Sequence, residues 1–498
     1  MENSAVDSDY HAALRFLLDR INYERNPAAA QTMRNFKLDR MGKLLAELGN
    51  PQERVPVVHV AGTKGKGSTA SMVASILGHA GLRTGLYTSP HLNQLEERFR
   101  INNENCTQQE LITLVDQLRP VVKKLEDQES SSPTYFELTT ALAWLHFATS
   151  SVDIAVIEVG MGGRLDSTNI CQPLISVITS ISLDHTAQLG NTLAEIAAEK
   201  AGIVKPGIAV ICGVTQDEPR DVIHQIVQQR HAPLVSLHQH FSFDVTDRSV
   251  SKVSDPTQFS AELSDPATTT FTYQDLCNPN HRSLSDLRVP LLGTHQAANA
   301  SLAVAAIRQL QDQGWQIHDH HIRDGLYNVH CPARVETLSK HPVVIVDAAH
   351  NLASAKALDA TLAEHFPAPS SSILIFSTSQ DKDAAGMLQV LLPRFDHCIV
   401  TRYRNNPRAL ATEDVLKTIT LMQENEDLGP LPDIHVAATP TESWRTAQEL
   451  AAPSDLICVT GSFFIAAEIR QLLTSAANVS AKAEHTENEV SSRPATSS

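Results

Sequence analysis

Apolar residues follow two kinds of spacing along the chain. Helical spacing marks residues 11–22 and again 36–52, where the pattern ends at a Gly-Asn-Pro sequence. Nearly continuous apolar runs come next, separated by helical stretches; the runs lie at 152–160, 173–181 and 208–214, and the helical stretches at 136–149 and 192–204. Such runs are typical of parallel strands that are buried on both faces. The pattern therefore predicts two N-terminal helices followed by an α/β unit with a parallel sheet.

The pattern changes in the second half of the chain. Residues 242–286 are rich in Ser, Thr, Asp and Pro, which favours short strands with long, mobile loops rather than core. A helical stretch follows at 296–314, and apolar runs then alternate with helical stretches again. We therefore predict an N-terminal domain over 1–330, a smaller α/β domain over 331–476, and a disordered tail over 477–498.

Composition narrows the class of protein. A length of 498 residues allows two or more cores, and a formal net charge of −16 leaves no basic stripe for a nucleic acid. No apolar run is long enough to cross a membrane, and the seven cysteines are scattered singly, as small core residues of a protein in a reducing compartment would be. These features predict a soluble cytoplasmic protein that binds small molecules, with no nucleic-acid or membrane partner.

The stretch VVHVAGTKGKGSTASMVASIL, Val57 to Leu77, is the first candidate binding element. It predicts a buried strand, a glycine-rich turn and a helix, an arrangement that presents backbone N–H groups to a phosphate. The glycines let the backbone approach phosphate oxygens, while the lysine adds charge and the serine a hydroxyl; these residues are Gly62, Gly65, Gly67, Lys66 and Ser68. The spacing differs from the common P-loop, and a turn that binds nothing is the alternative.

Candidate metal ligands follow other apolar runs. Glu158 ends the run 152–160, in the sequence IEVGMGGRLDSTN, and Asp184 and His185 come just after another. Ligand sites of open α/β sheets gather at such strand ends. Together with the hydroxyl of Ser89 in YTSPHL, Glu158 and His185 offer ligands for nucleotide-bound Mg²⁺. Taken singly, Glu158 could equally be a solvent-facing carboxylate, and His185 a histidine satisfied by its neighbours.

The C-terminal domain has its own polar residues near a predicted strand. Asp347 and His350 follow the apolar run in VVIVDAAHN, and Arg334 lies in CPARVE after the linker. Asp347 could hold a ribose hydroxyl and Arg334 a phosphate. The alternatives are a helix N-cap for the aspartate and a linker salt bridge for the arginine. The DKD sequence at 381–383 remains ambiguous.

These motifs together resemble the folylpolyglutamate synthase and dihydrofolate synthase family of Mur-ligase-like, ATP-dependent amide ligases. The resemblance spans about Tyr10 to Leu473 and depends on motifs in the family's order: GTKGKGS, YTSPHL, EVGMGGRLDSTN, TSISLDHTAQLG, EKAGIVKPG, PARVE, DAAHN, DKD and VTGSFF. It implies a parallel-sheet P-loop ATPase domain and a C-terminal Rossmann-like α/β domain, with ATP and substrates between them.

The resemblance also implies roles for individual residues. ATP would be bound by Gly62, Thr63, Gly65, Lys66, Gly67, Ser68, Thr69, Asn299, Arg334, Asp347 and His350. Magnesium would be held by Ser89, Glu158, His185 and Lys200, with Lys66, Lys200 and His185 as catalytic residues. Lys200 matches a lysine that can be carbamylated in this family, which turns its positive charge into a negative one that helps to hold a second Mg²⁺. A bound K⁺ is implied as well.

Two departures from the family pattern stand out. Lys64 stands where many bacterial members have asparagine. A lysine at this position resembles the pattern of eukaryotic polyglutamate synthases. DAAHNL replaces the usual D-G-A-H-N-P, so the second-domain turn lacks its glycine and proline. Neither change removes a proposed ligand. The region 242–286 is longer than in compact members, and we have no functional account of it.

The activity implied is ATP-dependent addition of L-glutamate to a folate or dihydropteroate carboxylate through an acyl phosphate. We predict a monomeric, bifunctional enzyme whose N-terminal helices border the pterin site. The alternatives are a monofunctional folylpolyglutamate synthase, a Mur-type peptidoglycan ligase, and a nucleotide-binding switch that hydrolyses little. A switch would not need the second α/β unit with its own polar residues.

Overall fold

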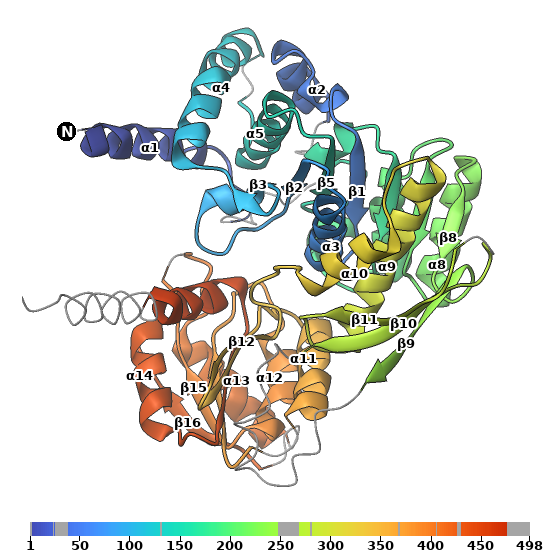
Figure 1. Cartoon of the computed structure of the whole chain (residues 1–498). Coiled ribbons are helices and arrows are strands. Elements are labelled where there is room, and N and C mark those ends of the chain that lie inside the picture. The colour runs from blue at the N-terminus through green and yellow to red at the C-terminus, as the bar shows by residue number, and fades with distance from the viewer. Residues whose placement is uncertain are drawn as a thin grey trace, which may run out of the picture. The chain divides into compact units, whose positions relative to one another are not determined.

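The computed structural model describes two compact units in sequence. The described residues are 2–22, 24, 38–129, 132–247, 268–278, 281–366, 369–404, 406–425 and 430–475. The first unit extends to Cys331 and the second begins at Pro332 (Figure 1). The tail predicted over 477–498 and the loop over 248–267 lie outside the described residues.

An eight-stranded sheet forms the centre of the first unit. Its strand order is β4-β3-β2-β5-β1-β6-β7-β8. The strands are β1 (Val57–Ala61), β2 (Thr84–Tyr87), β3 (Phe99–Ile101), β4 (Glu104–Asn105), β5 (Ile154–Glu158), β6 (Ile175–Ile178), β7 (Ala209–Cys212) and β8 (Leu234–Ser236). Neighbours from β2 to β8 pair in parallel, whereas β3 and β4 add an antiparallel edge. The predicted parallel sheet is confirmed. Its strands are shorter than the apolar runs from which they were predicted.

Helices cover both faces of this sheet. They are α1 (Glu2–Leu18), α2 (Leu38–Glu47), α3 (Lys66–His79), α4 (Gln108–Glu129), α5 (Tyr135–Thr149), α6 (Thr186–Leu189), α7 (Leu193–Lys200), α8 (Asp217–Gln229), α9 (Thr294–Asp312) and α10 (Asp319–Tyr327). Successive strand residues point to opposite faces. Accordingly Val58 and Val60 pack with α3, α9 and α10, while Val57 packs with residues of α1, α2, α4 and α5. This two-sided burial is why the strands read as continuous apolar runs.

Short 3₁₀ helices complete the connections of both units. They are η3 (Pro51–Glu53), η4 (Leu95–Arg98), η5 (Ser167–Ile170), η6 (Ala201–Ile203) and η7 (Leu392–Arg394). Of these, η6 continues α7 directly, so the predicted helix over 192–204 is an α-helix with a 3₁₀ end.

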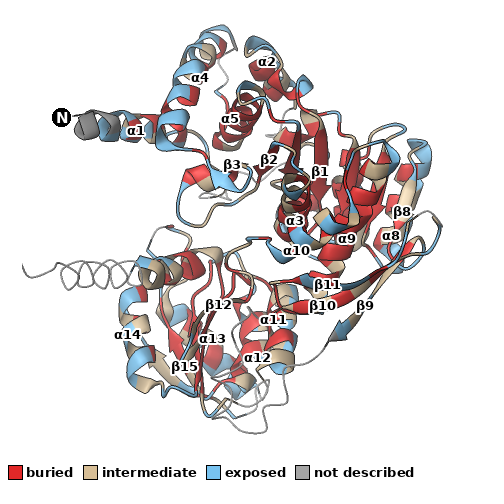
Figure 2. Cartoon of the chain, viewed as in Figure 1, coloured by how far each residue is buried: buried red, intermediate tan, exposed pale blue. Residues whose placement is uncertain are grey.

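A three-stranded antiparallel sheet corrects the prediction for residues 242–286. It consists of β9 (Phe241–Asp247), β10 (Thr269–Asp275) and β11 (Leu284–Val289), in the order β11-β10-β9. Phe271, Tyr273 and Leu287 are buried in the same core as β1, so these strands belong to the core and are not peripheral (Figure 2). The sequence signal was weak because only alternate residues face inward, and because Ser, Thr and Pro dominate the intervening stretch.

The second unit contains a six-stranded sheet in the order β12-β13-β17-β14-β15-β16. Its strands are β12 (Glu336–Lys340), β13 (Val343–Val346), β14 (Ser372–Phe376), β15 (His397–Val400), β16 (Asp433–Val436) and β17 (Leu456–Thr460). Its helices are α11 (Leu352–His365), α12 (Ala384–Leu391), α13 (Thr412–Glu424), α14 (Pro440–Leu450) and a C-terminal helix over 463–475. The interior strands match the predicted apolar runs, whereas the edge strands β12 and β16 are partly exposed and have no such run.

Two further expectations concern the burial of the cysteines and the lack of a membrane-spanning helix. All seven cysteines lie within the described residues as free thiols, and five are buried, but Cys277 is exposed and Cys331 half-buried. The assignment to core is therefore wrong for Cys277. Among the described helices, none combines the length and the apolar character needed to cross a bilayer.

Candidate functional site

The glycine-rich turn lies between β1 and α3, with its backbone packed too closely to admit larger residues. A Cβ atom on Gly62 (φ +146°) would lie 1.9 Å from Oγ1 of Thr179, and one on Gly65 (φ +83°) would lie 2.2 Å from Oδ1 of Asn299. Both conformations are ones that L side chains rarely adopt. Two of the predicted binding glycines therefore have a structural reason for their identity.

The start of α3 presents N–H groups without a side-chain cap. Gly65 is the N-cap residue and has no side chain to accept the hydrogen bonds of the first turn. Lys66 follows, and its ammonium donates a long hydrogen bond of 3.4 Å to the carbonyl of Thr63. An uncapped helix start with an adjacent lysine is a suitable site for an anion such as phosphate.

Residues that follow β6 hold this turn in place. The N–H of Thr63 donates to the carbonyl of Ser180 at 2.7 Å, and the Thr179 hydroxyl donates to the carbonyl of Lys64 at 2.6 Å. The Ser180 hydroxyl accepts from the N–H of Lys64 at 3.0 Å. Sequence reasoning missed Thr179 and Ser180, although β6 pairs directly with β1 and its following residues had to lie beside the turn.

Glu158 lies behind the turn at the end of β5. It is 5% exposed, and its Oε2 accepts a hydrogen bond from the N–H of Ser89 at 3.1 Å. A Cβ on Gly67 would lie 3.5 Å from the same oxygen, so the carboxylate borders the first turn of α3. The structure therefore brings Ser89, Glu158 and Gly67 together.

His185 stands at the N-terminus of α6, in a left-handed conformation with φ 51°. Its side chain is 42% exposed, and its Nε2 lies 4.0 Å from Oδ1 of Asp184. Asp184 in turn accepts a hydrogen bond of 2.9 Å from the Nζ of Lys64. Asp184 thus lies between Lys64, which departs from the bacterial pattern, and His185, the predicted metal ligand.

Lys200, at the end of α7, contacts the glycine-rich turn. It is 4% exposed, and its Nζ donates to the carbonyl of Gly62 at 2.9 Å. Burial, followed by the nearby charge of Lys66, holds the pKa of Lys200 well below its usual value. A lysine with a lowered pKa has a larger fraction of neutral, nucleophilic amine.

The remaining predicted residues of the first unit lie around α3. Ser68 is buried, with its hydroxyl 3.9 Å from the Sγ of Cys331. Thr69 is fully buried, and its hydroxyl has no hydrogen-bond partner among the described residues. Asn299 on α9 donates to Oε1 of Gln296 at 3.1 Å and faces the turn through its Oδ1.

Polar residues of the second unit gather where β13 ends. The two oxygens of Asp347 accept hydrogen bonds from the N–H groups of Val335 at 2.9 Å and Ala349 at 2.8 Å. Burial raises the pKa of Asp347, and the Arg334 guanidinium partly offsets that effect. The ring of Phe463 lies under the guanidinium of Arg334 at 4.9 Å.

His350 belongs to the same group of residues. The centroids of its imidazole and the Phe463 ring are 5.6 Å apart, and its Nδ1 lies 2.9 Å from the carbonyl oxygen of Ala348. The structure therefore brings Arg334, Asp347 and His350 together within the second unit. The phenylalanine between Arg334 and His350 lies in the VTGSFF motif, yet its position could not be read from the sequence.

Arg100 on β3 is a further polar residue that sequence reasoning missed. It is half-buried, desolvation lowers its pKa, and the charges of Glu97 and Glu158 act in the opposite direction. Its Nε is buried and has no hydrogen-bond partner among the described residues. A buried guanidinium nitrogen of this kind is available to an anionic ligand. No motif of the sequence pointed to it.

Two family models match the chain. The Mur ligase middle domain matches residues 60–307, and the glutamate ligase domain of Mur ligases matches residues 333–463. The dihydrofolate synthase/folylpolyglutamate synthase of Bacillus subtilis is 34% identical over 438 residues, covering 88% of this chain and 94% of the relative. The enzyme of the same name from Escherichia coli is 30% identical over 436 residues, covering 88% and 91%.

Solved structures agree with these matches. Mycobacterium tuberculosis folylpolyglutamate synthase complexed with ADP and AMPPCP has a TM-score of 0.81 and 30% identity, covering 94% of this chain and 99% of the other. Escherichia coli FolC in complex with DHPP and ADP has a TM-score of 0.75 and 28% identity, covering 89% and 94%. The extent of these matches along both units means that the chain belongs to the dihydrofolate synthase/folylpolyglutamate synthase family of Mur ligases.

Proposed function

We propose that this protein is an ATP-dependent ligase that adds L-glutamate to the carboxylate of dihydropteroate or of a reduced folate. The observation that carries the proposal is the turn after β1, where an uncapped helix start and Lys66 form an anion site bordered by the Glu158 carboxylate. The named relatives carry the same pair of activities.

The nucleotide phosphates bind at the turn in this proposal. Backbone N–H groups from Gly65 to Ser68 and the Lys66 ammonium surround them, and Asn299 adds an amide from α9. The N–H groups of Thr63 and Lys64 instead donate to Ser180, and that of Thr69 donates to Gly65. In the second unit, Asp347 accepts from a ribose hydroxyl and Arg334 and His350 contact the nucleotide. The contact of Arg334 with Phe463, at 4.9 Å from Cζ to the ring centroid, supports this role, because a cation–π contact holds the guanidinium in place.

Ser89, Glu158 and His185 suit a magnesium ion that accompanies the nucleotide. Their hydroxyl, carboxylate and imidazole groups leave room for phosphate oxygens and water, which Mg²⁺ prefers. The N–H of Ser89 already orients the Glu158 carboxylate, as an outer hydrogen bond to a metal ligand does. When bound, Mg²⁺ would neutralise negative charge on the phosphates. A bound K⁺ completes the set of ions that we propose.

The proposed reaction has two steps. An oxygen of the substrate carboxylate attacks the γ-phosphorus, the bond from that phosphorus to the bridging oxygen of ADP breaks, and an acyl phosphate forms. The neutral amine of glutamate then attacks the acyl carbon, inorganic phosphate leaves, and the amine proton passes to solvent. Lys66 stabilises the charge that develops on the transferring phosphoryl group, and the rigid turn keeps the phosphates in line.

Lys200 is proposed to work as a carbamate. Its neutral amine would attack CO₂, lose a proton to solvent and become an anion that helps to hold a second Mg²⁺. Its lowered pKa and its position 2.9 Å from the Gly62 carbonyl support this role. We expect Lys200→Ala to lose activity and to regain part of it with a short carboxylic acid. Full activity of Lys200→Ala without the acid would contradict the carbamate.

The decisive experiment is glutamate-dependent release of phosphate from MgATP, measured in parallel with dihydropteroate and with tetrahydrofolate, with products identified by mass. We expect turnover with both, as a bifunctional enzyme requires. Turnover with only one substrate would assign a single activity. A UDP-linked peptidoglycan precursor serves as the control substrate, because turnover with it alone would support the Mur-type alternative.

The N-terminal helices α1 and α2 are proposed to border the pterin site, and the protein to act as a cytoplasmic monomer. Sedimentation of the purified chain at micromolar concentration, with and without MgATP, tests the monomer. A dimer in either condition would contradict it.

A further inference from the structure

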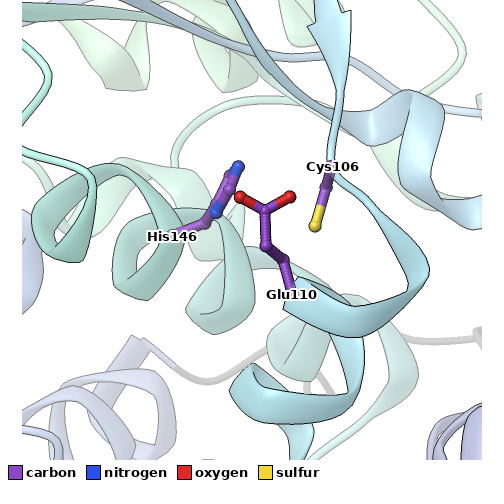
Figure 3. A group of neighbouring side chains, drawn as sticks. All are labelled: Cys106, Glu110 and His146. Atoms are coloured by element: carbon purple, nitrogen blue, oxygen red, sulfur yellow. The ribbon is translucent and has the colours of Figure 1, made fainter. Parts of the chain in front are cut away.

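Three potential metal ligands lie together away from the nucleotide site. They are Cys106 just before α4, Glu110 in the first turn of α4, and His146 on α5 (Figure 3). One ligand atom from each residue lies within 4.8 Å of the others. No other group of three His, Cys, Asp or Glu residues comes so close together in the part of the chain that the structure describes.

Local structure holds the carboxylate of this group in place. Oε2 of Glu110 accepts hydrogen bonds from both the N–H and the hydroxyl of Thr107, each at 2.7 Å, which satisfies the start of α4. The carboxylate lies between the imidazole of His146 and the thiol of Cys106 (Figure 3). Because both of these hydrogen bonds use Oε2, the oxygen Oε1 can serve a metal without loss of the cap.

Burial and packing fix the other two members. Cys106 is 3% exposed and His146 is also 3% exposed, whereas Glu110 is exposed. Helices α4 and α5 pack against each other in one core, which brings the histidine to the first turn of α4. The group is therefore rigid on its protein side and open to solvent on the side of the glutamate, where an ion can enter.

The donor set selects the class of metal. A thiolate sulfur, an imidazole nitrogen and a carboxylate oxygen are the usual ligands of Zn²⁺, whereas Mg²⁺ and Ca²⁺ prefer oxygen ligands alone. Tetrahedral Zn²⁺ with bonds of about 2.0–2.3 Å separates its ligand atoms by roughly 3.3–3.8 Å. Contraction from 4.8 Å requires a shift of about 1 Å, which side-chain torsions can supply.

Charge balance also favours a divalent ion. One thiolate and one carboxylate cancel the charge of Zn²⁺, so the half-buried complex is neutral. The neighbouring charges oppose each other: Arg83, which is exposed, acts on Glu110 and His146, and Glu96 acts on Cys106.

We propose that Cys106, Glu110 and His146 bind one Zn²⁺, with water in the fourth position. On binding, the S–H bond of Cys106 breaks, the sulfur donates its electron pair to zinc, and the proton leaves to solvent. The ion would tie the start of α4 to α5 and stabilise the native state by mass action.

The test uses the full-length protein, stripped of metal with a chelator and titrated with Co²⁺, whose complexes with thiolates absorb in the near ultraviolet. We expect one equivalent of Co²⁺ to give this band and one equivalent of Zn²⁺ to abolish it. Zn²⁺ should also raise the midpoint of thermal unfolding. Absence of the band, or a band that Zn²⁺ does not displace, overturns the proposal.

Two variants locate the site. Glu110→Gln keeps a side chain suited to the cap but removes the carboxylate, and it should weaken Co²⁺ binding by about tenfold or more. Cys106→Ser should lose the band. Cys277→Ser is the matched control, because it removes the exposed thiol that could bind metal adventitiously, and it should keep the band.

Two results with the cysteine variants would contradict the zinc site. A band that persists in Cys106→Ser, or one that is lost in Cys277→Ser, overturns the proposal. If Cys106→Ser does not fold, Glu110→Gln decides, since Co²⁺ affinity equal to that of the original protein would exclude the carboxylate and with it the site. The test measures metal binding, so it stands apart from the ligase activity.

Discussion

The loops that follow β1 and β13 occupy equivalent positions, since each connects a strand to a helix in its own α/β unit. Their backbones are held in place in opposite ways. After β1, positive-φ glycines bring the backbone against Thr179 and Asn299, and the groups proposed to bind phosphate are backbone N–H groups and a lysine. After β13, the buried carboxylate of Asp347 organises the turn by accepting two N–H groups. The first loop depends on the absence of side chains, and the second on the presence of one.

In this chain the turn after β13 accommodates alanine where the family pattern has glycine. Ala348 and Ala349 are not among the positive-φ residues, so this turn does not require glycine. The positive φ values of this region fall instead at Ala333 (φ 55°) and Val335 (φ 49°), beside Arg334. The backbone strain of the second loop therefore lies on the segment that carries the arginine.

The largest expected effect is that of Gly62→Ala. Its Cβ would lie 1.9 Å from Oγ1 of Thr179 at φ +146°, so we expect a loss of stability of about 3 kcal/mol or more and loss of turnover. Gly81→Ala is the control, since it has φ +82° but open space, and should cost about 1–2 kcal/mol. In the second loop Ala349→Gly should cost about 1 kcal/mol. Denaturant unfolding measures all three, and equal costs for Gly62→Ala and Gly81→Ala would contradict the packing argument.

The next effect is on catalysis alone. Lys66→Ala should reduce kcat by at least roughly 10²–10³-fold, because it removes charge from the phosphate site, with little change in the midpoint of thermal unfolding. The exposed Lys123→Ala on α4 is the control and should retain turnover. Normal phosphate release by Lys66→Ala would remove the lysine from its proposed role.

Asp347→Asn tests the second loop. The amide has one acceptor oxygen, so the N–H of Val335 or Ala349 loses its partner, which should cost about 1–3 kcal/mol. If Asp347 also holds the ribose, the KM for ATP should rise about tenfold. Asp381→Asn, which weakens a partly exposed ion pair with Arg408, should cost no more than about 1 kcal/mol. An unchanged KM for ATP in Asp347→Asn would exclude the ribose contact.

The smallest expected effect is on the pH dependence of stability. It distinguishes strand β1, which contains a histidine, from strand β13, which does not. Burial lowers the pKa of His59 in β1 to about 3, whereas β13 has only aliphatic residues. Between pH 6.5 and about 3 the unfolded chain binds a proton that the folded chain does not, so stability falls with falling pH by up to about 1.4 kcal/mol per unit. His59→Gln should reduce this slope, as followed by thermal unfolding at pH 7, 6 and 5.

The control for this prediction separates titration from hydrogen bonding. Nε2 of His59 lies 2.9 Å from Oγ1 of Thr168. Thr168→Val removes that hydroxyl, which also donates to Oδ1 of Asp166 at 2.5 Å, but it keeps the histidine, so it should lower stability while His59 still contributes its own pH dependence. An unaltered slope in His59→Gln would show that another group accounts for the acid sensitivity of the first unit.

The sequence was informative wherever one residue type is required by local geometry. Buried parallel strands need apolar residues at nearly every position, so β1, β5, β6 and β7 could be predicted. Gly62 and Gly65 reflect a backbone conformation, and their motif carried the family resemblance. The fold class and the family are confirmed by the structure and by the relatives, whereas the roles of the individual site residues stay predictions.

Only the tertiary structure decided what depends on contacts between distant segments. It placed β9, β10 and β11 in the core, although their alternating pattern is interrupted by a long polar stretch. It also placed Thr179 against Gly62, Phe463 under Arg334, and Cys106 beside Glu110 and His146. These pairs are separated in the chain by elements whose packing, and not their local sequence, determines which side chains meet. A periodic pattern reports which face of an element is buried, but it does not report the partner that buries it.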